Sequence, residues 1–235
     1  MSRRPRFYFS FRSPYSWLAY HDLRTEHPQV LRELEWRPFW EPDVQSERML
    51  TELGGRFIYA PMSKEKHLYL LRDVRRLAQR RGLTITWPLD DAPWWEVAHL
   101  AYFAAVDAGQ GPAFVERVYR ARWQEGRNIS DPDTIAELAE SVGVPGDAAR
   151  SAVDRTEMRE RGAQALLAID RDGVFGVPFF IDRSQRFWGI DRLNDFLASL
   201  GGNTTSGAAL LTDASPASAT HDRRTADHGH AGGCG

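Results

Sequence analysis

The chain has 235 residues, of which 42% are hydrophobic and 26% are charged, and its formal net charge is −2 at pH 7. These values are ordinary for one globular domain, or for one domain that carries a large insert. A net charge this close to zero argues against a general binder of nucleic acid or of anionic membranes. No apolar run approaches the ~18 residues that a membrane span requires. The apolar stretch near the N-terminus is too short for a signal peptide, so we expect a cytoplasmic protein.

Cysteine chemistry is limited to one residue, Cys234, next to the C-terminus. One cysteine cannot form an intramolecular disulfide, and the Cys-x-x-Cys pair of a disulfide oxidoreductase is missing. The eight tryptophans are many for this length. They could build a core, or they could line a pocket for a flat aromatic ligand.

The first 40 residues predict a strand, a helix and a second strand. Residues 6–11 (RFYFSF) form an aromatic-rich run that is typical of a strand. Ser13 is a favoured N-cap residue and Pro14 suits the first helical position, so a helix is expected from there to about Glu26. Residues 34–39 predict the second strand. This βαβ unit implies a parallel pair of strands joined by a right-handed crossover.

A long helical stretch follows, and short strands and a helix close the chain. From about residue 63, leucine, valine and alanine recur at helical spacing until Gly82. Glycines and prolines separate further predicted helices over residues 96–108, 113–123, 132–141 and 147–169. The last predicted elements are the two arms of a hairpin and a helix, over residues 179–182, 185–187 and 191–200.

The order βαβ, several helices and ββα is that of an α/β, thioredoxin-like fold interrupted by a large all-helical insertion. We expect residues 1–62 and 170–201 to form the thioredoxin-like domain. Residues 63–169 are then the helical insertion.

From residue 202 the composition shifts to Gly, Ala, Ser, Thr, Asp and His, which predicts a disordered C-terminal tail over residues 202–235. The tail contains three histidines and the cysteine, at His221, His228, His230 and Cys234. Such a group could bind a metal loosely, but a His-rich tail more often binds nothing specific, so we predict no metal site.

Ser13 stands where thioredoxin-like oxidoreductases have a catalytic cysteine, and Ser16 takes the place of the second cysteine. A helix N-terminus has unpaired N–H groups and a partial positive charge, so it stabilises an anion such as a thiolate. A hydroxyl cannot carry electrons, but it can donate a hydrogen bond to a thiolate supplied by another molecule. Such a bond contributes roughly 1.5–3 kcal/mol, or about one to two units of thiol pKa. The alternative is that Ser13 is only a helix cap, which is a common role of serine.

A proline lies between a glycine-rich turn and an apolar strand in residues 173–180 (GVFGVPFF). Proline can begin a strand but cannot donate within one, and a cis Val177–Pro178 bond would turn the chain sharply. In a thioredoxin-like sheet this turn faces the start of the first helix, which frees the N–H and C=O of Val177 to pair with a peptide-like ligand. A trans proline on an edge strand is the alternative, and the sequence does not decide the isomer.

Residues 188–193 (WGIDRL) come just before the last predicted helix. Asp191 could cap that helix, which is the more common role of such a residue. It could instead receive the ammonium of a γ-glutamyl group, while nearby backbone N–H groups hold the carboxylate.

Three segments together resemble the 2-hydroxychromene-2-carboxylate isomerases, relatives of kappa-class glutathione transferases and of DsbA-like thioredoxin-fold proteins. These segments are residues 7–19 (FYFSFRSPYSWLA), 175–178 (FGVP) and 187–193 (FWGIDRL). Between them, the family's helix pattern Y-x(3)-D-x(2)-R-x-A-x(3)-G is matched by Tyr69, Asp73, Arg76, Ala78 and Gly82. Residues 123–126 (WQEG) resemble its W-x-E-G segment. The resemblance covers about residues 6–200.

The resemblance implies an isomerase, or a related transferase, that acts on an aromatic or polyketide-like small molecule with glutathione or another low-molecular-weight thiol as cofactor. In the family, the serine matching Ser13 hydrogen-bonds the glutathione sulfur. The residue matching Val177, next to Pro178, pairs with the cysteinyl backbone. The pair matching Ile190 and Asp191 holds the γ-glutamyl end. Members of the family are often dimers, so the resemblance is compatible with a homodimer, and no nucleic-acid or membrane partner is expected.

Two departures from the family pattern keep other functions open. The family usually has Asn, Ser or Gln where this chain has Ile190, which removes a hydrogen bond of ~1 kcal/mol. The pairs at residues 90–91 (DD) and 94–95 (WW), in the presumed pocket wall, match no pattern of the family. The alternatives are a thiol-independent tailoring enzyme of secondary metabolism on the same fold and a non-catalytic, DsbA-like binding protein.

Overall fold

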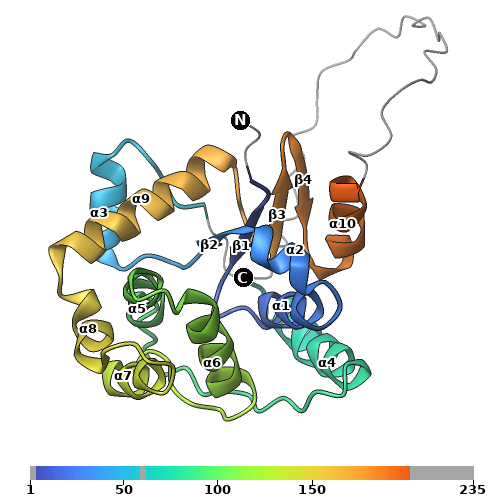
Figure 1. Ribbon diagram of the computed structural model, residues 1–235, viewed down its shortest axis with the longest axis horizontal. Helices are drawn as coiled ribbons and strands as arrows, with labels where there is room; N and C mark the ends of the chain where they lie inside the picture. Colours follow the sequence, from blue (N-terminus) through green and yellow to red (C-terminus); the bar gives the residue numbers. More distant parts are fainter. Residues whose placement is uncertain (1–3, 59–61, 202–235) are drawn as a thin grey trace, which may run out of the picture.

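The computed structural model describes residues 4–58 and 62–201 (Figure 1). Four short strands form one mixed sheet in the order β2-β1-β3-β4. β1 pairs in parallel with β2 and antiparallel with β3, and β3 pairs antiparallel with β4. The strands are Arg6–Phe9 (β1), Glu35–Pro38 (β2), Phe179–Asp182 (β3) and Gln185–Trp188 (β4). This is the predicted thioredoxin-like order, with a helical insertion between β2 and β3.

The two central strands are buried along their whole length, because aromatic side chains fill both faces of the sheet. Phe7 of β1 lies opposite Phe180 of β3, and their rings stack with centroids 5.0 Å apart. Phe180 stacks in turn on Phe196 of the last helix, at 4.8 Å. These buried rings fix the sheet against the helix that follows it, and they stabilise the fold through their large apolar area.

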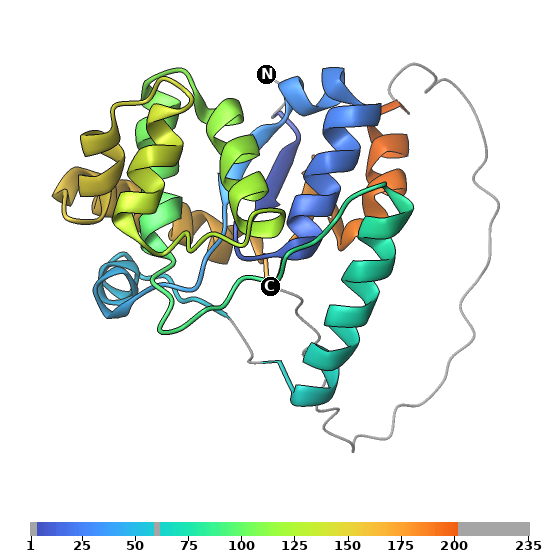
Figure 2. The same ribbon diagram turned by 90° about the horizontal axis from the view of Figure 1, so that it is seen from below.

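The helices form two groups around the sheet (Figures 1 and 2). α1, α4 and α10 make up one group, and α3 and α5 to α9 make up the other. The bounds are α1 Pro14–Glu26, α2 Pro28–Glu33, α3 Val44–Glu52, α4 Lys64–Arg80, α5 Glu96–Asp107, α6 Gly111–Trp123, α7 Pro132–Glu140, α8 Gly146–Arg150, α9 Thr156–Asp172 and α10 Leu193–Gly201. The C-terminal end of β1 therefore lies next to helices of both groups (Figures 1 and 2).

The single helix predicted over residues 147–169 is wrong, because the chain breaks between α8 and α9. A 3-10 turn, Ser151–Val153, ends α8, and Arg155 is extended. The Ser151 hydroxyl donates to the carbonyl of Asp147 at 2.6 Å, and Arg159 Nε donates to the freed carbonyl of Val153 at 2.6 Å. The Arg159 side chain thus satisfies a backbone carbonyl that a continuous helix would have paired internally.

Two short helices were not predicted. Pro28 does not only end α1: it also takes the first position of α2, where its missing N–H costs nothing. α3 begins after Asp43, whose carboxylate caps the helix by accepting from Ser46 N–H at 2.8 Å. The last predicted helix begins as a 3-10 turn, Ile190–Arg192, before α10.

No helix in residues 4–58 and 62–201 is long and apolar enough to span a membrane. Within the same residues, no group of three or more His, Cys, Asp or Glu side chains could hold a metal ion. The predicted disorder of residues 202–235, and the histidines and cysteine of that tail, lie outside the described residues.

Candidate active site

Ser13 lies at the point where the chain leaves β1 and enters α1. Its side chain accepts a hydrogen bond from Ser16 N–H at 3.2 Å, which makes it the helix N-cap. Pro14 follows at the first helical position. The first turn of α1 contains no acidic side chain, so that turn itself supplies no counter-charge for the positive end of the helix dipole.

The turn before β3 faces this helix start. The Val177–Pro178 peptide bond is cis, and the Ser13 hydroxyl donates to the Val177 carbonyl at 3.4 Å. The structure therefore brings the two segments together, although they are 164 residues apart in sequence. It also differs from the expectation of a free Val177 carbonyl, because Ser13 already occupies that acceptor. Ser13 is completely buried and Val177 is 1% exposed.

Strand pairing brings a third segment to the same place. Gly189 N–H donates to the Pro178 carbonyl at 2.9 Å, just after Trp188 pairs with Phe179. Gly189 has a φ of +97°, and a Cβ atom there would lie 2.6 Å from Asp191 Oδ1, so the local backbone requires glycine. The turn that begins at Ile190 has no side-chain cap. Asp191 therefore does not cap that turn.

A cavity of about 590 Å³ opens beside the cis proline, and we call it the Pro178 cavity. It brings together four of the five predicted site residues, namely Val177, Pro178, Ile190 and Asp191. Ser13 does not line it, because no part of the Ser13 side chain is exposed. The other lining residues are Tyr15, Tyr69, Asp73, Leu77, Arg81, Trp188, Gly189 and Arg192.

Helices α1 and α4 supply the part of the Pro178 cavity wall that sequence reasoning missed. Tyr15 donates its hydroxyl to Asp73 Oδ2 at 2.8 Å, and Arg76 donates to Asp73 Oδ1 at 2.9 Å. Arg81 makes two bonds of 2.6 Å to Asp22. The motif match on α4 included Asp73 but gave it no role. Its carboxylate and the Arg81 guanidinium are occupied by protein partners, so Asp191, 72% exposed at its side chain, is the more accessible charge.

A second cavity, of about 490 Å³, shares the start of α1, and we call it the Trp123 cavity. Arg12 and Pro14 line it, so the residues on either side of Ser13 reach this space. The other lining residues are Met62, His67, Leu70, Leu71, Arg75, Trp87, Pro88, Asp90, Arg122 and Trp123. Ser13 therefore lies, fully buried, between residues that line two different cavities.

Apolar side chains supply most of the lining of the Trp123 cavity, and its polar side chains are mainly hydrogen-bond donors. Arg122 is 2% exposed, binds Asp90 through two bonds of 2.9 and 2.7 Å, and lies over the ring of Trp123 at 4.8 Å. Arg122 Nε and Trp123 Nε1 are buried and have no hydrogen-bond partner among the described residues. Asp90 is the one carboxylate among the described lining residues. This wall suits a flat ligand that carries acceptor oxygens.

The neighbouring Trp94 has a structural role. Its Nε1 donates to Asp43 at 2.9 Å, and Arg159 donates to the same carboxylate at 2.7 Å. Burial acts to raise the pKa of Asp43, but the hydrogen bonds from Ser46, Arg159 and Trp94 outweigh it and hold that pKa below its usual range. Burial raises the pKa of Glu96, whose Oε1 accepts from the Asp43 N–H at 2.6 Å. The network joins α3, α5 and α9.

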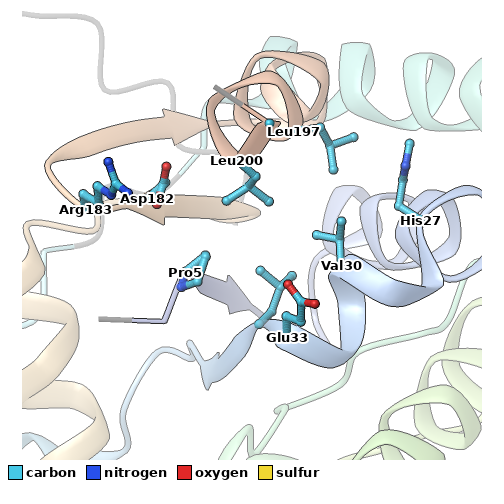
Figure 3. Close-up of a pocket in the computed structure, with 10 residues that line it drawn as sticks. Pro5, His27, Val30, Glu33, Asp182, Arg183, Leu197 and Leu200 are labelled. Atoms are coloured by element: carbon cyan, nitrogen blue, oxygen red, sulfur yellow. The ribbon is translucent and has the colours of Figure 1, made fainter. Parts of the chain in front are cut away.

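A third cavity, of about 530 Å³, lies between α2, α10 and the β3–β4 turn (Figure 3). Val30, Leu197 and Leu200 give it apolar walls. It is at the opposite end of the sheet from Ser13, because Asp182 ends β3 whereas Val177 precedes that strand. It contains none of the predicted site residues.

Comparisons with known proteins agree with this geometry. A model of the DSBA-like thioredoxin domain matches residues 6–201. The 2-hydroxychromene-2-carboxylate isomerase of Sphingobium xenophagum is 33% identical over 211 residues, which are 85% of this chain and 98% of that protein. Glutathione S-transferase kappa 1 of Homo sapiens is 21% identical over 222 residues, covering 88% and 94% of the two chains.

Solved structures show the same relationship. The structure of a 2-hydroxychromene-2-carboxylate isomerase superposes with a TM-score of 0.67 at 25% identity, covering 85% of this chain and 95% of that one. The expected family and fold are thereby confirmed. The chain belongs to the DSBA-like thioredoxin domain family and, within it, to the family of the 2-hydroxychromene-2-carboxylate isomerases.

Proposed function

We propose that this protein is a thiol-dependent isomerase that acts on an aromatic or polyketide-like small molecule, with glutathione or another low-molecular-weight thiol as its cofactor. The observation that carries the proposal is the Ser13 hydroxyl at the start of α1, 3.4 Å from the carbonyl of Val177 in the cis-proline loop. Free thiols are maintained in a reducing compartment, so the proposal includes a cytoplasmic location.

Ser13 and the start of α1 stabilise negative charge on sulfur in this proposal. The helix dipole favours an anion there, and the first turn holds no carboxylate to compete with it. The hydroxyl adds a charge-assisted hydrogen bond worth roughly 1.5–3 kcal/mol. When bound, the thiol would supply a nucleophile that adds reversibly to a conjugated double bond, which allows rotation before the thiol leaves.

A thiol reaches the Ser13 hydroxyl only if the contact between Ser13 and Val177 opens slightly. The hydroxyl is buried and its bond to Val177 is long for an O–H···O bond. A sulfur atom that enters between Ser13 and Val177 replaces this weak contact with a stronger one. The Val177 carbonyl is then released toward the Pro178 cavity, where a peptide-like thiol would pair with it.

The far end of the Pro178 cavity would hold the rest of the thiol cofactor. The Asp191 side chain is largely exposed, and its nearest cation is Arg192 Nε at 3.8 Å. Exposed ion pairs of this kind are weak, so Asp191 is available to an ammonium group. Ile190 supplies only its backbone and an apolar side chain.

The Trp123 cavity would hold the substrate of the isomerisation. It begins at Arg12 and Pro14, next to the residue that would hold the sulfur. The half-buried indole of Trp87 offers an aromatic surface, and the unpaired Nε atom of Arg122 and Nε1 atom of Trp123 are donors without acceptors. A flat substrate with oxygen acceptors would satisfy them after a small side-chain shift.

A thiol-independent enzyme on the same fold is the second candidate. Two observations favour it: Ser13 has no exposed surface, and Ile190 offers no side-chain hydrogen bond to a γ-glutamyl group. In that case Ser13 only caps α1 and ties it to the Val177 carbonyl. The Trp123 cavity would then be the reaction site on its own.

Calorimetric titration with glutathione, and with other low-molecular-weight thiols, separates the two candidates. Binding at millimolar or lower concentration supports the proposal, and no binding of any thiol supports the second candidate. Ser13→Ala is then compared with Ser63→Ala in thiol-dependent isomerisation of hydroxychromene carboxylates. Ser63 is the matched control, because it caps α4 in the same way, accepting from Lys66 N–H at 3.3 Å. We expect Ser13→Ala to lose about tenfold or more in turnover, while Ser63→Ala keeps the wild-type rate.

A further inference from the structure

His99 of α5 is a completely buried histidine that faces the turn between β1 and α1. Its ring stacks on Trp40, with centroids 5.3 Å apart and an angle of 18° between the planes. Phe11 contacts it from the turn, at 5.0 Å between centroids. The helical insertion thus reaches the thioredoxin-like part through this ring.

The hydrogen bonds of His99 fix which ring nitrogen carries the proton. Nδ1 lies 2.6 Å from the Trp95 carbonyl, which can only accept, so Nδ1 holds the hydrogen. Nε2 is therefore an acceptor, and it receives the Phe11 N–H at 3.2 Å and lies 3.4 Å from Ser10 Oγ. Burial, with a further contribution from Arg122 and Arg12, lowers the pKa of His99 to about 3. The ring therefore stays neutral, and Nε2 stays an acceptor, at any physiological pH.

The residues that His99 holds also hold Ser13. The Ser10 carbonyl accepts from the Ser13 N–H at 3.2 Å and from the Tyr119 hydroxyl at 3.1 Å. The Ser10 N–H is directed at Ser16 Oγ, at 3.4 Å. The turn from Ser10 to Ser13 is thus fixed by α5 and α6 of the insertion as well as by α1.

We infer that His99 is a positioning residue for the site: as an acceptor for the Phe11 N–H and a partner of Ser10, it sets where the Ser13 hydroxyl lies relative to Val177. The inference rests on the proposed function, since it gives His99 its importance through Ser13. His99 itself lines neither the Pro178 cavity nor the Trp123 cavity. Its effect therefore passes through the turn.

Three substitutions test this positioning role. His99→Gln places an amide oxygen near the position of Nε2 and keeps an acceptor for the Phe11 N–H. His99→Asn is too short to reach that N–H, and His99→Leu has no acceptor. We expect kcat for thiol-dependent isomerisation to fall by about tenfold to hundredfold in His99→Asn and His99→Leu, as small misplacements of reacting groups do. His99→Gln should recover most of the rate, with the KM for the substrate nearly constant across the set.

Amide hydrogen exchange on the same proteins gives a readout that does not need activity. The peptide that spans residues 10–16 should exchange faster in His99→Asn than in wild type, and His99→Gln should protect it. His27→Leu is the control, since His27 lies at the end of α1 far from the turn. If His99→Leu fails to fold, the comparison of His99→Gln with His99→Asn still tests the positioning role.

Equal rates and equal exchange for His99→Gln and His99→Asn would overturn the positioning role. A wild-type protein without any thiol-dependent turnover would instead overturn the proposed function. In that case the exchange data alone decide whether His99 holds the turn, so the two failures are distinguishable.

Discussion

Replacing Gly189 by alanine should both destabilise the protein and displace Asp191 from the Pro178 cavity. Gly189 has φ +97° and ψ 159°, a region that is almost reserved for glycine, so another residue costs about 1–3 kcal/mol. The new Cβ would lie 2.6 Å from Asp191 Oδ1, and the carboxylate has to swing away. The strain and the displaced carboxylate together should lower the free energy of unfolding by about 2–3 kcal/mol, and Tm should therefore fall by roughly 4–12 °C. Glutathione binding should weaken by about tenfold, because a charge-assisted bond is lost.

Gly143→Ala is the matched control for the backbone strain alone. Gly143 has φ +81°, but a Cβ atom there meets nothing within 4 Å. Gly143→Ala should lower the free energy of unfolding by about 1–2 kcal/mol, and with it Tm, without any change in thiol affinity. Thermal unfolding and titration calorimetry measure the two effects on both variants. The reasoning is refuted if the Gly189 and Gly143 variants bind glutathione equally well.

Three further substitutions have distinct expected outcomes. Glu96→Gln should raise the free energy of unfolding at neutral pH, since burial raises the folded-state pKa of Glu96 above its unfolded value and glutamine keeps an acceptor for the Asp43 N–H. The gain in stability over wild type is full at a pH above the folded-state pKa of Glu96. It shrinks as the pH falls through that pKa toward the pKa of the unfolded state. Urea unfolding at several pH values measures this dependence. Ile190→Asn should tighten glutathione binding by about fivefold in calorimetry, because it adds a hydrogen bond of about 1 kcal/mol. Asp191→Asn should weaken glutathione binding. Asp195→Asn is the control, because Asp195 is a neighbouring exposed carboxylate outside the cavity lining, and it should leave the binding unchanged. Equal effects of the two substitutions would contradict the role of Asp191.

Local chemistry made the helix start and the sheet predictable from sequence. Serine followed by proline is a strong N-cap signal, and the structure places both residues at the start of α1. The aromatic run after residue 6 predicted β1, and the apolar residues after Pro178 predicted β3. Each of these signals depends on neighbouring residues only.

Contacts between distant segments were not predictable in the same way. His99 meets Phe11 across 88 residues, and Tyr15 meets Asp73 across 58. No local pattern in the sequence encodes such pairs, because the fold that joins them depends on the whole chain. The break between α8 and α9 was missed for a related reason: Arg159, beyond the break, satisfies the backbone carbonyl that the break frees.

The burial of Ser13 also depends on tertiary structure. The sequence placed a hydroxyl at a helix start, which is an exposed position in an isolated helix. In the fold, the Val177 loop covers it and accepts its hydrogen bond. The site is therefore more closed than a helix cap alone would indicate, and in the proposed function a thiol has to separate these two segments to reach the hydroxyl.

The most direct test of the central claim is the ionisation of a bound thiol, followed by the ultraviolet absorbance of the thiolate during a pH titration of the glutathione complex. In the wild-type protein, the thiol pKa should lie about one to two units below its value in the complex with the Ser13→Ala variant. If the two complexes titrate at the same pH, the Ser13 hydroxyl does not contact the sulfur and the proposed mechanism is wrong.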